Sequence, residues 1–322
     1  MAAQSLTVGV DLGGTKIQTA ILRGLDVLGT ARVSTPQTGG DDVAAAIMVT
    51  INEAAAAAKV RATMLGLIGV GSPGTVDQKT GLVSHAANIN GFEAGYALGK
   101  RLAGLTGAKV VIDNDVRVAV LGEHRAGAGR GIDNFLGVFL GTGVGGGLVL
   151  NGVLRRGRGA AGEVGHTVVK DEGRLCGCGR RGCLEAYASR SGIERQARAL
   201  MKKGRKTELF DIMHARGRST LTGGVIYRAL ERKDRVTLEL IDDAVWALGI
   251  ALASAQNLLD LEGMIIGGGL GDRLGQPFID RVTAAMHPHL FVDDRPPKLL
   301  PTALKDLSGA VGAALLAADS LT

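Results

Sequence analysis

The residues whose types and spacing point most directly to chemistry lie in Glu163–Glu185, EVGHTVVKDEGRLCGCGRRGCLE. This segment holds all three cysteines of the chain and, before them, one histidine. Three thiolates and one imidazole are a ligand set of closed tetrahedral zinc sites, and the intervening glycines let the backbone wrap tightly enough to aim the sulfurs at one point. Three unrelated thiols, or a disulfide with one cysteine left over, are the alternatives, but neither explains so dense a cluster. We therefore predict a structural Zn²⁺ bound by His166, Cys176, Cys178 and Cys183.

Two glycine turns have the composition of phosphate-binding sites. The first, LGGTK, joins predicted strands at Leu6–Asp11 and Ile17–Leu22, and the second, Gly141–Gly147, joins Phe135–Leu140 to Leu148–Leu154. Exposed backbone N–H groups at such turns form a concave anion site, and glycine lets a phosphate approach closely. A structural hairpin is the default interpretation of each turn taken alone. Neither turn fits the dinucleotide-binding or Walker A pattern, which require a following helix and a different residue order.

The side chains in and beside these turns predict a bound nucleotide. Asp11 can hold Mg²⁺ through water, while Thr15 and Lys16 can reach phosphate oxygens. Thr142 offers a hydroxyl to the transferred group, and a third glycine turn at 267–269 can approach the nucleoside. The predicted ATP-binding residues are Asp11, Gly13, Gly14, Thr15, Lys16, Gly141, Thr142, Gly143, Gly267, Gly268 and Gly269.

The remaining elements suggest two related α/β lobes, because strand–glycine turn–strand occurs twice, about 130 residues apart. Residues 202–222 are basic and irregular, which indicates a surface excursion. The expected helices are Asp41–Lys59, Ala97–Leu105, Val116–Arg125, Asp242–Leu259, one from near Gln276, and Asp306–Ala318. Further strands are expected at Met64–Gly71, Lys109–Ile112 and Gly263–Ile266.

Composition limits the classes of protein that fit. The chain has 322 residues, of which 46% are hydrophobic and 3% aromatic, with 50 glycines and a formal charge of +6. This describes a globular protein whose core is aliphatic. No apolar run is long enough to span a membrane and no signal peptide is evident. Cysteines confined to one metal-like cluster are typical of a reducing compartment, so we expect a cytoplasmic protein with no membrane partner.

Taken together, the motifs resemble those of the ROK family (repressor, open reading frame, kinase) of the actin-like ATPase fold, and its sugar kinases in particular. The resemblance covers essentially the whole chain, and GEVGH followed by the cysteine cluster is its most specific part. The matching segments are DLGGTK (11–16), SPG (72–74), NINGF (88–92), DND (113–115), GTGVGGG (141–147), GEVGH (162–166), CGCGRRGCLE (176–185) and GGGL (267–270).

The resemblance implies an α/β fold of two actin-like ATPase (ribonuclease H-like) lobes, with an interlobe active-site cleft and a small zinc-binding loop. We expect residues 1–118 and 306–322 to form a smaller N-terminal lobe. Residues 119–305 would form a larger lobe, with the zinc-binding loop at 163–185.

It also implies individual roles. Asp115 would be the general base that takes a proton from the sugar hydroxyl during attack on the γ-phosphorus of ATP. His166 would use one ring nitrogen for zinc and the other for the sugar, which makes the metal a brace for the sugar-binding loop. The residues expected to bind the sugar are Asn88, Asn114, Asp115, Glu163, His166 and Glu185. A helix N-cap is the structural alternative for Asp115.

One departure from the family pattern lies beside this base. The family usually has small residues and an asparagine after the base, whereas this chain has Val116, Arg117 and Val118. Arg117 is unexpected so near a sugar pocket, and it puts the shape of the site and the preferred hexose in question.

The predicted function is ATP- and Mg²⁺-dependent phosphorylation of a hexose, D-glucose to glucose 6-phosphate. N-acetylmannosamine, fructose and allose are alternative substrates. A sugar-responsive repressor of the same family is a second class, but only ten residues precede Asp11, so we expect no DNA-binding module and no nucleic-acid partner. A chaperone ATPase would need neither GEVGH nor the cysteines. We expect a homo-oligomer, either a dimer or a tetramer.

Overall fold

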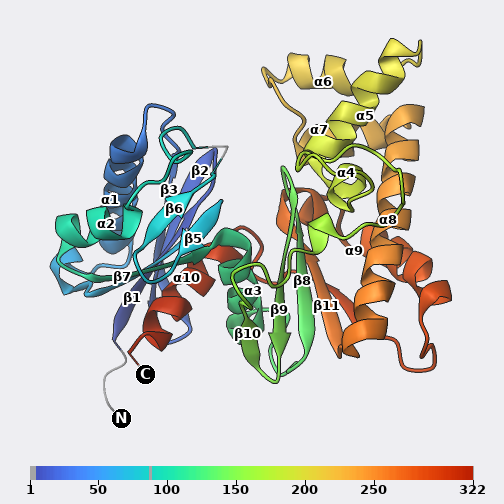
Figure 1. Cartoon of the computed structure of the whole chain (residues 1–322). Helices are drawn as coiled ribbons and strands as arrows, with labels where there is room; N and C mark the ends of the chain where they lie inside the picture. The colour runs from blue at the N-terminus through green and yellow to red at the C-terminus, as the bar shows by residue number, and fades with distance from the viewer. Residues whose placement is uncertain (1–4, 87–88, 322) are drawn as a thin grey trace. The chain divides into compact units, whose positions relative to one another are not determined.

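The computed structural model describes residues 5–86 and 89–321. Contacts divide the chain into two compact units. The first unit takes the described residues of Met1–Gly131, Gly157–Gly159 and Asp306–Thr322, and the second takes Ile132–Arg156 and Ala160–Lys305. Both ends of the chain therefore belong to the first unit, as the blue strands and the red helix α10 show in Figure 1. The mixed α/β architecture predicted from the sequence is confirmed.

The first unit is built on a five-stranded sheet of order β3-β2-β1-β4-β7. The first three strands are antiparallel, whereas β1, β4 and β7 are parallel. Its elements are β1 (Leu6–Leu12), β2 (Lys16–Arg23), β3 (Asp26–Ser34), α1 (Gly40–Ala57), a 3₁₀ turn at Ala62–Met64, β4 (Leu67–Ser72), β5 (Thr75–Asp77), β6 (Leu82–Ser84), α2 (Leu98–Thr106), β7 (Lys109–Asn114), α3 (Asp115–Ala126), a 3₁₀ turn at Lys305–Leu307 that ends inside this unit, and α10 (Ser308–Asp319).

The second unit repeats this topology with the order β10-β9-β8-β11-β12. The hairpins β8–β9 and β9–β10 are antiparallel, while β8, β11 and β12 are parallel. Its elements are β8 (Phe135–Leu140), β9 (Val144–Leu150), β10 (Val153–Arg155), a 3₁₀ turn at Val164–His166, α4 (Glu185–Ala188), α5 (Arg190–Lys202), α6 (Leu209–Ala215), α7 (Gly223–Glu231), α8 (Arg235–Leu259), β11 (Gly263–Gly267), α9 (Gly268–Met286), a 3₁₀ turn at His287–His289, and β12 (Lys298–Pro301).

Helix α10 packs unusually close to the first sheet because two strands carry glycine at the contact. A Cβ on Gly9 of β1 would lie 1.8 Å from the Ala310 carbonyl oxygen, and one on Gly69 of β4 would lie 1.8 Å from that of Ala313. No larger residue fits at either position. Alanine-rich α10 and the two glycines thus form one closely packed layer, which offsets the scarcity of aromatic residues in this core.

Three local features differ from the sequence predictions. Residues 202–222 contain the helix α6, whose Leu209, Phe210 and Met213 are buried, so this part of the segment is core and not surface. Helix α9 (Gly268–Met286) is interrupted at Gly275, which has φ +65°, so the predicted helix from near Gln276 is its second part and an additional helical segment from Gly268 precedes it. Contacts assign all of α3 to the first unit, whereas a division after residue 118 would cut this helix.

Among the described residues, no helix combines the length and the apolar character needed to cross a lipid bilayer.

Candidate active site and metal centre

Three predicted motifs of the first unit meet at one edge of its sheet. Because β1, β4 and β7 run parallel, their carboxyl ends lie on the same side. Asp11 is paired with Gly71 and Ser72 with Asn114, so DLGG, SPG and DND follow neighbouring strands. Ligands of α/β proteins bind at the carboxyl ends of parallel strands. The strand order therefore gathers these polar residues where a ligand can bind.

The β1–β2 turn is rigidly braced. Gly13 N–H donates to the Lys16 carbonyl at 2.9 Å, which closes the turn. The Thr35 hydroxyl donates to the Gly13 carbonyl at 2.6 Å, and the Gln37 amide donates to the Gly14 carbonyl at 3.1 Å. Two carbonyl groups of the turn are thus hydrogen-bonded by side chains that follow β3. These contacts fix the conformation of the turn, and they could not be predicted from the local sequence because their donors lie 22 and 23 residues away.

The carboxylates of this edge repel one another. Burial, followed by the nearby Asp115 carboxylate, raises the pKa of Asp11 to about 7, although Lys16 opposes the shift. Lys16 itself forms a salt bridge of 2.9 Å with Asp306. Close packing adds to the burial, since a Cβ on Gly309 of α10 would lie 2.5 Å from the Asp11 carboxyl carbon. A cation beside Asp11 and Asp115 would relieve this repulsion, so the donor set fits Mg²⁺ held through water.

Helix α3 begins directly after β7, which places Asp115 in its first turn. The Asn114 side chain caps the helix, accepting from Val116 N–H at 3.0 Å and Arg117 N–H at 3.2 Å. Asp115 is the first helical residue and its Oδ1 accepts from Val116 N–H at 2.9 Å. The capping role therefore belongs to Asn114, and the partly buried Asp115 carboxylate is not needed for it.

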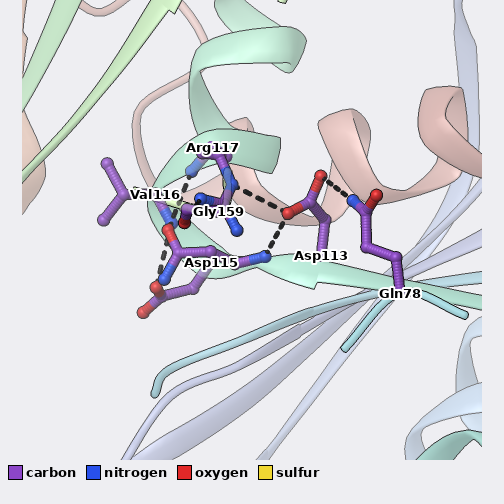
Figure 2. Close-up of polar contacts among 7 residues, drawn as sticks. Gln78, Asp113, Asp115, Val116, Arg117 and Gly159 are labelled. Atoms are coloured by element: carbon purple, nitrogen blue, oxygen red, sulfur yellow. Dashed lines mark hydrogen bonds and ion pairs between the residues drawn. The ribbon is translucent and has the colours of Figure 1, made fainter. Parts of the chain in front are cut away.

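Behind the cap lies a buried ion pair that Figure 2 shows. Arg117 Nε lies 2.8 Å from Asp113 Oδ1, and the two side chains are only 6% and 0% exposed. The Gln78 amide donates to Asp113 Oδ2 at 2.5 Å, while Arg117 Nη1 donates to the Gly159 carbonyl at 2.7 Å. The side chain of Arg117 is thus engaged by Asp113, the residue before the Asn114 cap. It also attaches the segment 157–159 to the rest of the first unit through the Gly159 carbonyl.

Arg117→Met is expected to lower the free energy of unfolding by about 3–5 kcal/mol, because it leaves the Asp113 carboxylate buried without its counter-charge. Urea unfolding followed by circular dichroism measures the loss. Arg125→Met is the matched control on the same helix, since the Arg125–Asp319 pair is 43% and 45% exposed and should contribute less than about 1 kcal/mol. Equal stability of the two variants would show that the buried pair does not hold this turn.

The second unit gathers its glycine turns at the corresponding edge. Strands β8 and β11 are parallel, and each ends at a glycine turn, 141–143 and 267–269. Gly268 has φ +81°, and a Cβ there would lie 2.7 Å from the Leu140 carbonyl oxygen. The turn at 267–269 therefore contacts the end of β8, directly before the turn at 141–143. Only glycine satisfies both this conformation and this contact.

Helix α5 braces the first of these turns. Arg190 N–H donates to the Gly141 carbonyl at 3.1 Å, and the Ser191 hydroxyl donates to the Thr142 carbonyl at 2.6 Å. Arg190 Nη2 also donates to the Thr142 hydroxyl at 2.9 Å. Burial lowers the pKa of the Arg190 guanidinium, and its Nε is buried with no hydrogen-bond partner among the described residues. The Arg190 guanidinium therefore brings a positive charge to this turn, which is electrostatically suited to an anion.

The glycines at the end of GTGVGGG have a packing role. A Cβ on Gly146 of β9 would lie 2.4 Å from the Gly162 carbonyl oxygen, and one on Gly165 would lie 2.0 Å from the Val144 carbonyl oxygen. The GEVGH segment therefore lies directly on β9. This close approach places Glu163 and His166 beside the turn that follows β8.

The four predicted zinc ligands lie together. Their ligand atoms are all within 4.8 Å of one another, with Cys176 Sγ 3.9 Å from His166 Nδ1 and Cys178 Sγ 3.8 Å from Cys183 Sγ. Ligands at about 2.3 Å from a tetrahedral zinc ion are about 3.8 Å apart. The cluster therefore fits a zinc ion, and the use of Nδ1 leaves His166 Nε2 for a second partner.

Metal binding at this cluster would have to deprotonate its buried cysteines. Burial raises the pKa of the Cys176 thiol to about 12, and it raises that of Cys183. The Arg180 backbone N–H lowers the pKa of Cys178. Two buried thiols would thus stay protonated without a cation, and a divalent metal is the group that stabilises adjacent thiolates.

Glu185 joins the metal cluster to the glycine turn. Its Oε1 lies 3.4 Å from Cys176 Sγ, and its Oε2 accepts from Val144 N–H at 3.0 Å. A Cβ on Gly143 would lie 2.4 Å from Oε2, so glycine at 143 makes room for this carboxylate. Glu185, a residue predicted to bind the sugar, therefore contacts both the metal cluster and the glycine turn at 141–143.

Comparison with known proteins identifies the family of this chain. The ROK family model matches residues 7–320. The chain belongs to the ROK family. A glucokinase of Halalkalibacterium halodurans is 37% identical over 84% of this chain and 83% of its own. An N-acetylmannosamine kinase of Yersinia pestis is 33% identical over 98% of this chain and 99% of its own length. The ROK family glucokinase from Streptomyces griseus, solved with glucose and AMPPNP, superposes with TM-score 0.80 at 33% identity over 98% of this chain and 100% of that one.

This ROK protein brings many of the predicted residues together within each unit. Asp11, the 13–16 turn, Asn114 and Asp115 lie at one edge of the first sheet, and Asn88 falls outside the described residues. In the second unit, Glu185 joins the metal cluster, of which His166 is a member, to the 141–143 turn, and Glu163 belongs to the GEVGH segment that packs on β9. The 141–143 turn adjoins 267–269.

Sequence reasoning missed the roles of three polar residues of these sites. Arg190 follows the cysteine motif by only a few positions, and a basic residue there was a usable signal for a phosphate contact. Gln78 gave no such signal, because it matters only through its contact with the distant Asp113; Asp113 itself stands in the DND motif, but its ion pair with Arg117 is seen only in the structure.

Proposed function

We propose that this ROK protein is an ATP:hexose 6-phosphotransferase whose principal substrate is D-glucose. The observation that carries the proposal is the position of Asp115, in the first turn of a helix that Asn114 caps, at the carboxyl edge of a sheet and near Asp11. The glucokinase relatives and the AMPPNP complex of the Streptomyces griseus enzyme support both substrates.

In the proposed reaction, the Asp115 carboxylate accepts the proton of the sugar 6-hydroxyl as its oxygen attacks the γ-phosphorus of ATP. The new O–P bond forms while the bond to the β–γ bridging oxygen breaks, which releases ADP. Phosphoryl transfer depends mainly on positioning and charge stabilisation. Mg²⁺, when bound, would neutralise charge on the phosphates. The backbone N–H groups of the turns at 13–16 and 141–143, with the Arg190 guanidinium, would bind the phosphate oxygens.

The sugar would be held by Asn88, Asn114, Asp115, Glu163, His166 and Glu185. Carboxylates and amides that each match one hydroxyl discriminate between hexose epimers, because an unmatched buried polar group is costly. Structural zinc at His166, Cys176, Cys178 and Cys183 would keep the His166 ring and the Glu185 carboxylate in place.

A coupled assay of ADP release over a panel of hexoses tests this proposal. We expect the highest kcat/KM with glucose. The N-acetylmannosamine kinase relative favours N-acetylmannosamine as the second candidate substrate. A higher kcat/KM with that sugar would replace glucose in the proposal, and no turnover with any hexose would reject it.

Arg190→Met is expected to lower kcat/KM for ATP about ten- to hundredfold, because a charge-assisted hydrogen bond to phosphate contributes about 1.5–3 kcal/mol. Arg190→Lys should recover part of the loss, since it keeps the charge. Arg198→Met serves as the control, because Arg198 is half exposed on the same helix and pairs with Glu194. Unchanged ATP kinetics in Arg190→Met would remove this residue from the site.

We also propose that the enzyme requires Mg²⁺, works in the cytoplasm and forms a homo-oligomer, either a dimer or a tetramer. Light scattering coupled to size-exclusion chromatography measures the oligomeric state, and a titration of activity with Mg²⁺ at fixed ATP tests the metal requirement.

A further inference from the structure

A cavity of about 370 Å³ in the second unit borders the metal cluster at Cys176, and no residue to which the proposed function gives a contact with ATP or sugar lines it. Three arginines line it, Arg174, Arg181 and Arg195, and we call it the arginine pocket. Its walls also include the apolar side chains of Leu175, Ala186 and Ala199, and no carboxylate is among its lining residues. A concave site with several guanidinium groups is electrostatically suited to an anion.

Arg174 is held in place before any ligand binds. Its guanidinium stacks over the Tyr187 ring at 4.6 Å, and its Nη2 is bonded to the Asp243 carboxylate. Its backbone N–H donates to the Tyr187 hydroxyl at 3.1 Å. The remaining nitrogen, Nη1, is buried and has no hydrogen-bond partner among the described residues. The stacking and the ion pair therefore fix the Arg174 guanidinium in the wall of the pocket, so no ordering of this side chain is needed when an anion binds.

The other two arginines come from different elements. Arg181 pairs with Leu175 in a short bridge, and its Nη1 donates to the Gly173 carbonyl at 3.1 Å. Arg195 lies on α5, the helix that follows the metal-ligand segment in the sequence. Within the described part of the chain, neither guanidinium has a carboxylate partner. Asp243 pairs only with Arg174, so the pocket keeps two positive charges that no salt bridge of the described residues compensates, although the Glu185 carboxylate lies in the neighbourhood of Arg195.

We propose that the arginine pocket binds a phosphate monoester. A phosphate dianion matches the two uncompensated charges, and its oxygens can accept from guanidinium groups in the bidentate geometry that arginine favours. The volume exceeds that of a phosphate alone, and Leu175, Ala186 and Ala199 can contact the organic part of the ligand. This site is additional to the proposed function, because none of its three arginines takes part in the catalytic scheme.

The test is calorimetric titration of the whole protein with inorganic phosphate at constant ionic strength. A saturating non-hydrolysable ATP analogue is present, so that phosphate cannot occupy the glycine turns. We expect Arg195→Gln and Arg181→Gln each to weaken phosphate binding about tenfold or more, the value of one charge-assisted hydrogen bond. Lys202→Gln removes one charge from the exposed end of the same helix as Arg195 and should leave the affinity unchanged.

Circular dichroism and zinc content would establish that each variant is folded. Arg195 lies on the exposed face of α5, so Arg195→Gln decides the question even if Arg181→Gln fails to fold next to the cysteines. No phosphate binding by the unmodified protein would overturn the proposal. Equal affinity of Arg195→Gln and the unmodified protein, or an equal loss in Lys202→Gln, would overturn it as well.

Discussion

Asp115→Asn is expected to lower kcat for sugar phosphorylation about 10²- to 10⁴-fold, the usual contribution of a general base. Asparagine keeps the size and the polar contacts of the side chain but cannot accept the proton of the attacking hydroxyl. The Asn114 cap supports the start of α3 independently, so we expect the fold to be retained. Steady-state kinetics with the coupled ADP assay measures the effect.

Sugar binding separates this prediction from a general loss of structure. Titration calorimetry with glucose should give an affinity within a few fold of that of the unmodified protein, because only the proton acceptor is changed. Near-normal kcat in Asp115→Asn would refute the assignment of the base. A folded variant that no longer binds glucose would show that the negative charge of Asp115 is needed to hold the sugar, and that a neutral amide at this position cannot replace it.

Cys178→Ser is expected to release the bound zinc and destabilise the second unit. Cys178 is the exposed member of the ligand set, so this substitution disturbs packing less than one at a buried cysteine. A metal at about 1,000 times its Kd stabilises the folded state by about 4 kcal/mol, and this contribution should be lost. Zinc content by atomic absorption and thermal unfolding followed by the fluorescence of Trp246, the single tryptophan, measure both effects.

The same variant tests whether the metal braces the sugar site. Since His166 and Glu185 both contact Cys176, we expect the KM for glucose to rise about ten- to hundredfold. Leu175→Ser is the control, because Leu175 is exposed in the same loop but is not a ligand. Zinc loss with unchanged glucose KM would limit the metal to a folding role, and full zinc retention would exclude Cys178 as a ligand.

The sequence predicted several parts of the site because their partners are close along the chain. The metal ligands are concentrated in one short glycine-rich segment, and their spacing alone indicated a tetrahedral site that the atoms of the structure fit. The two strand–turn–strand motifs likewise predicted two related α/β halves. The topology confirms this, since both sheets have the same order of parallel and antiparallel strands. Local motifs also identified the ROK family, which the family model confirms.

Position along the sequence misled in two places. The apolar residues of α6 lie in a basic, irregular stretch, so their burial could not be seen without their partners. Asn114 and Asp115 are both good capping residues, and only the backbone geometry decided that Asn114 caps α3.

By itself, then, the sequence determined the family, the residues of the Cys/His cluster and the type of each lobe, because those depend on neighbouring residues and on motif order. Tertiary structure alone decided which side chains support them. Arg117 joins Asp113 to Gly159, and Arg190 reaches Thr142, across separations that no local pattern reports. Such contacts follow from strand order and close glycine packing, which bring distant residues together only when the whole unit has folded.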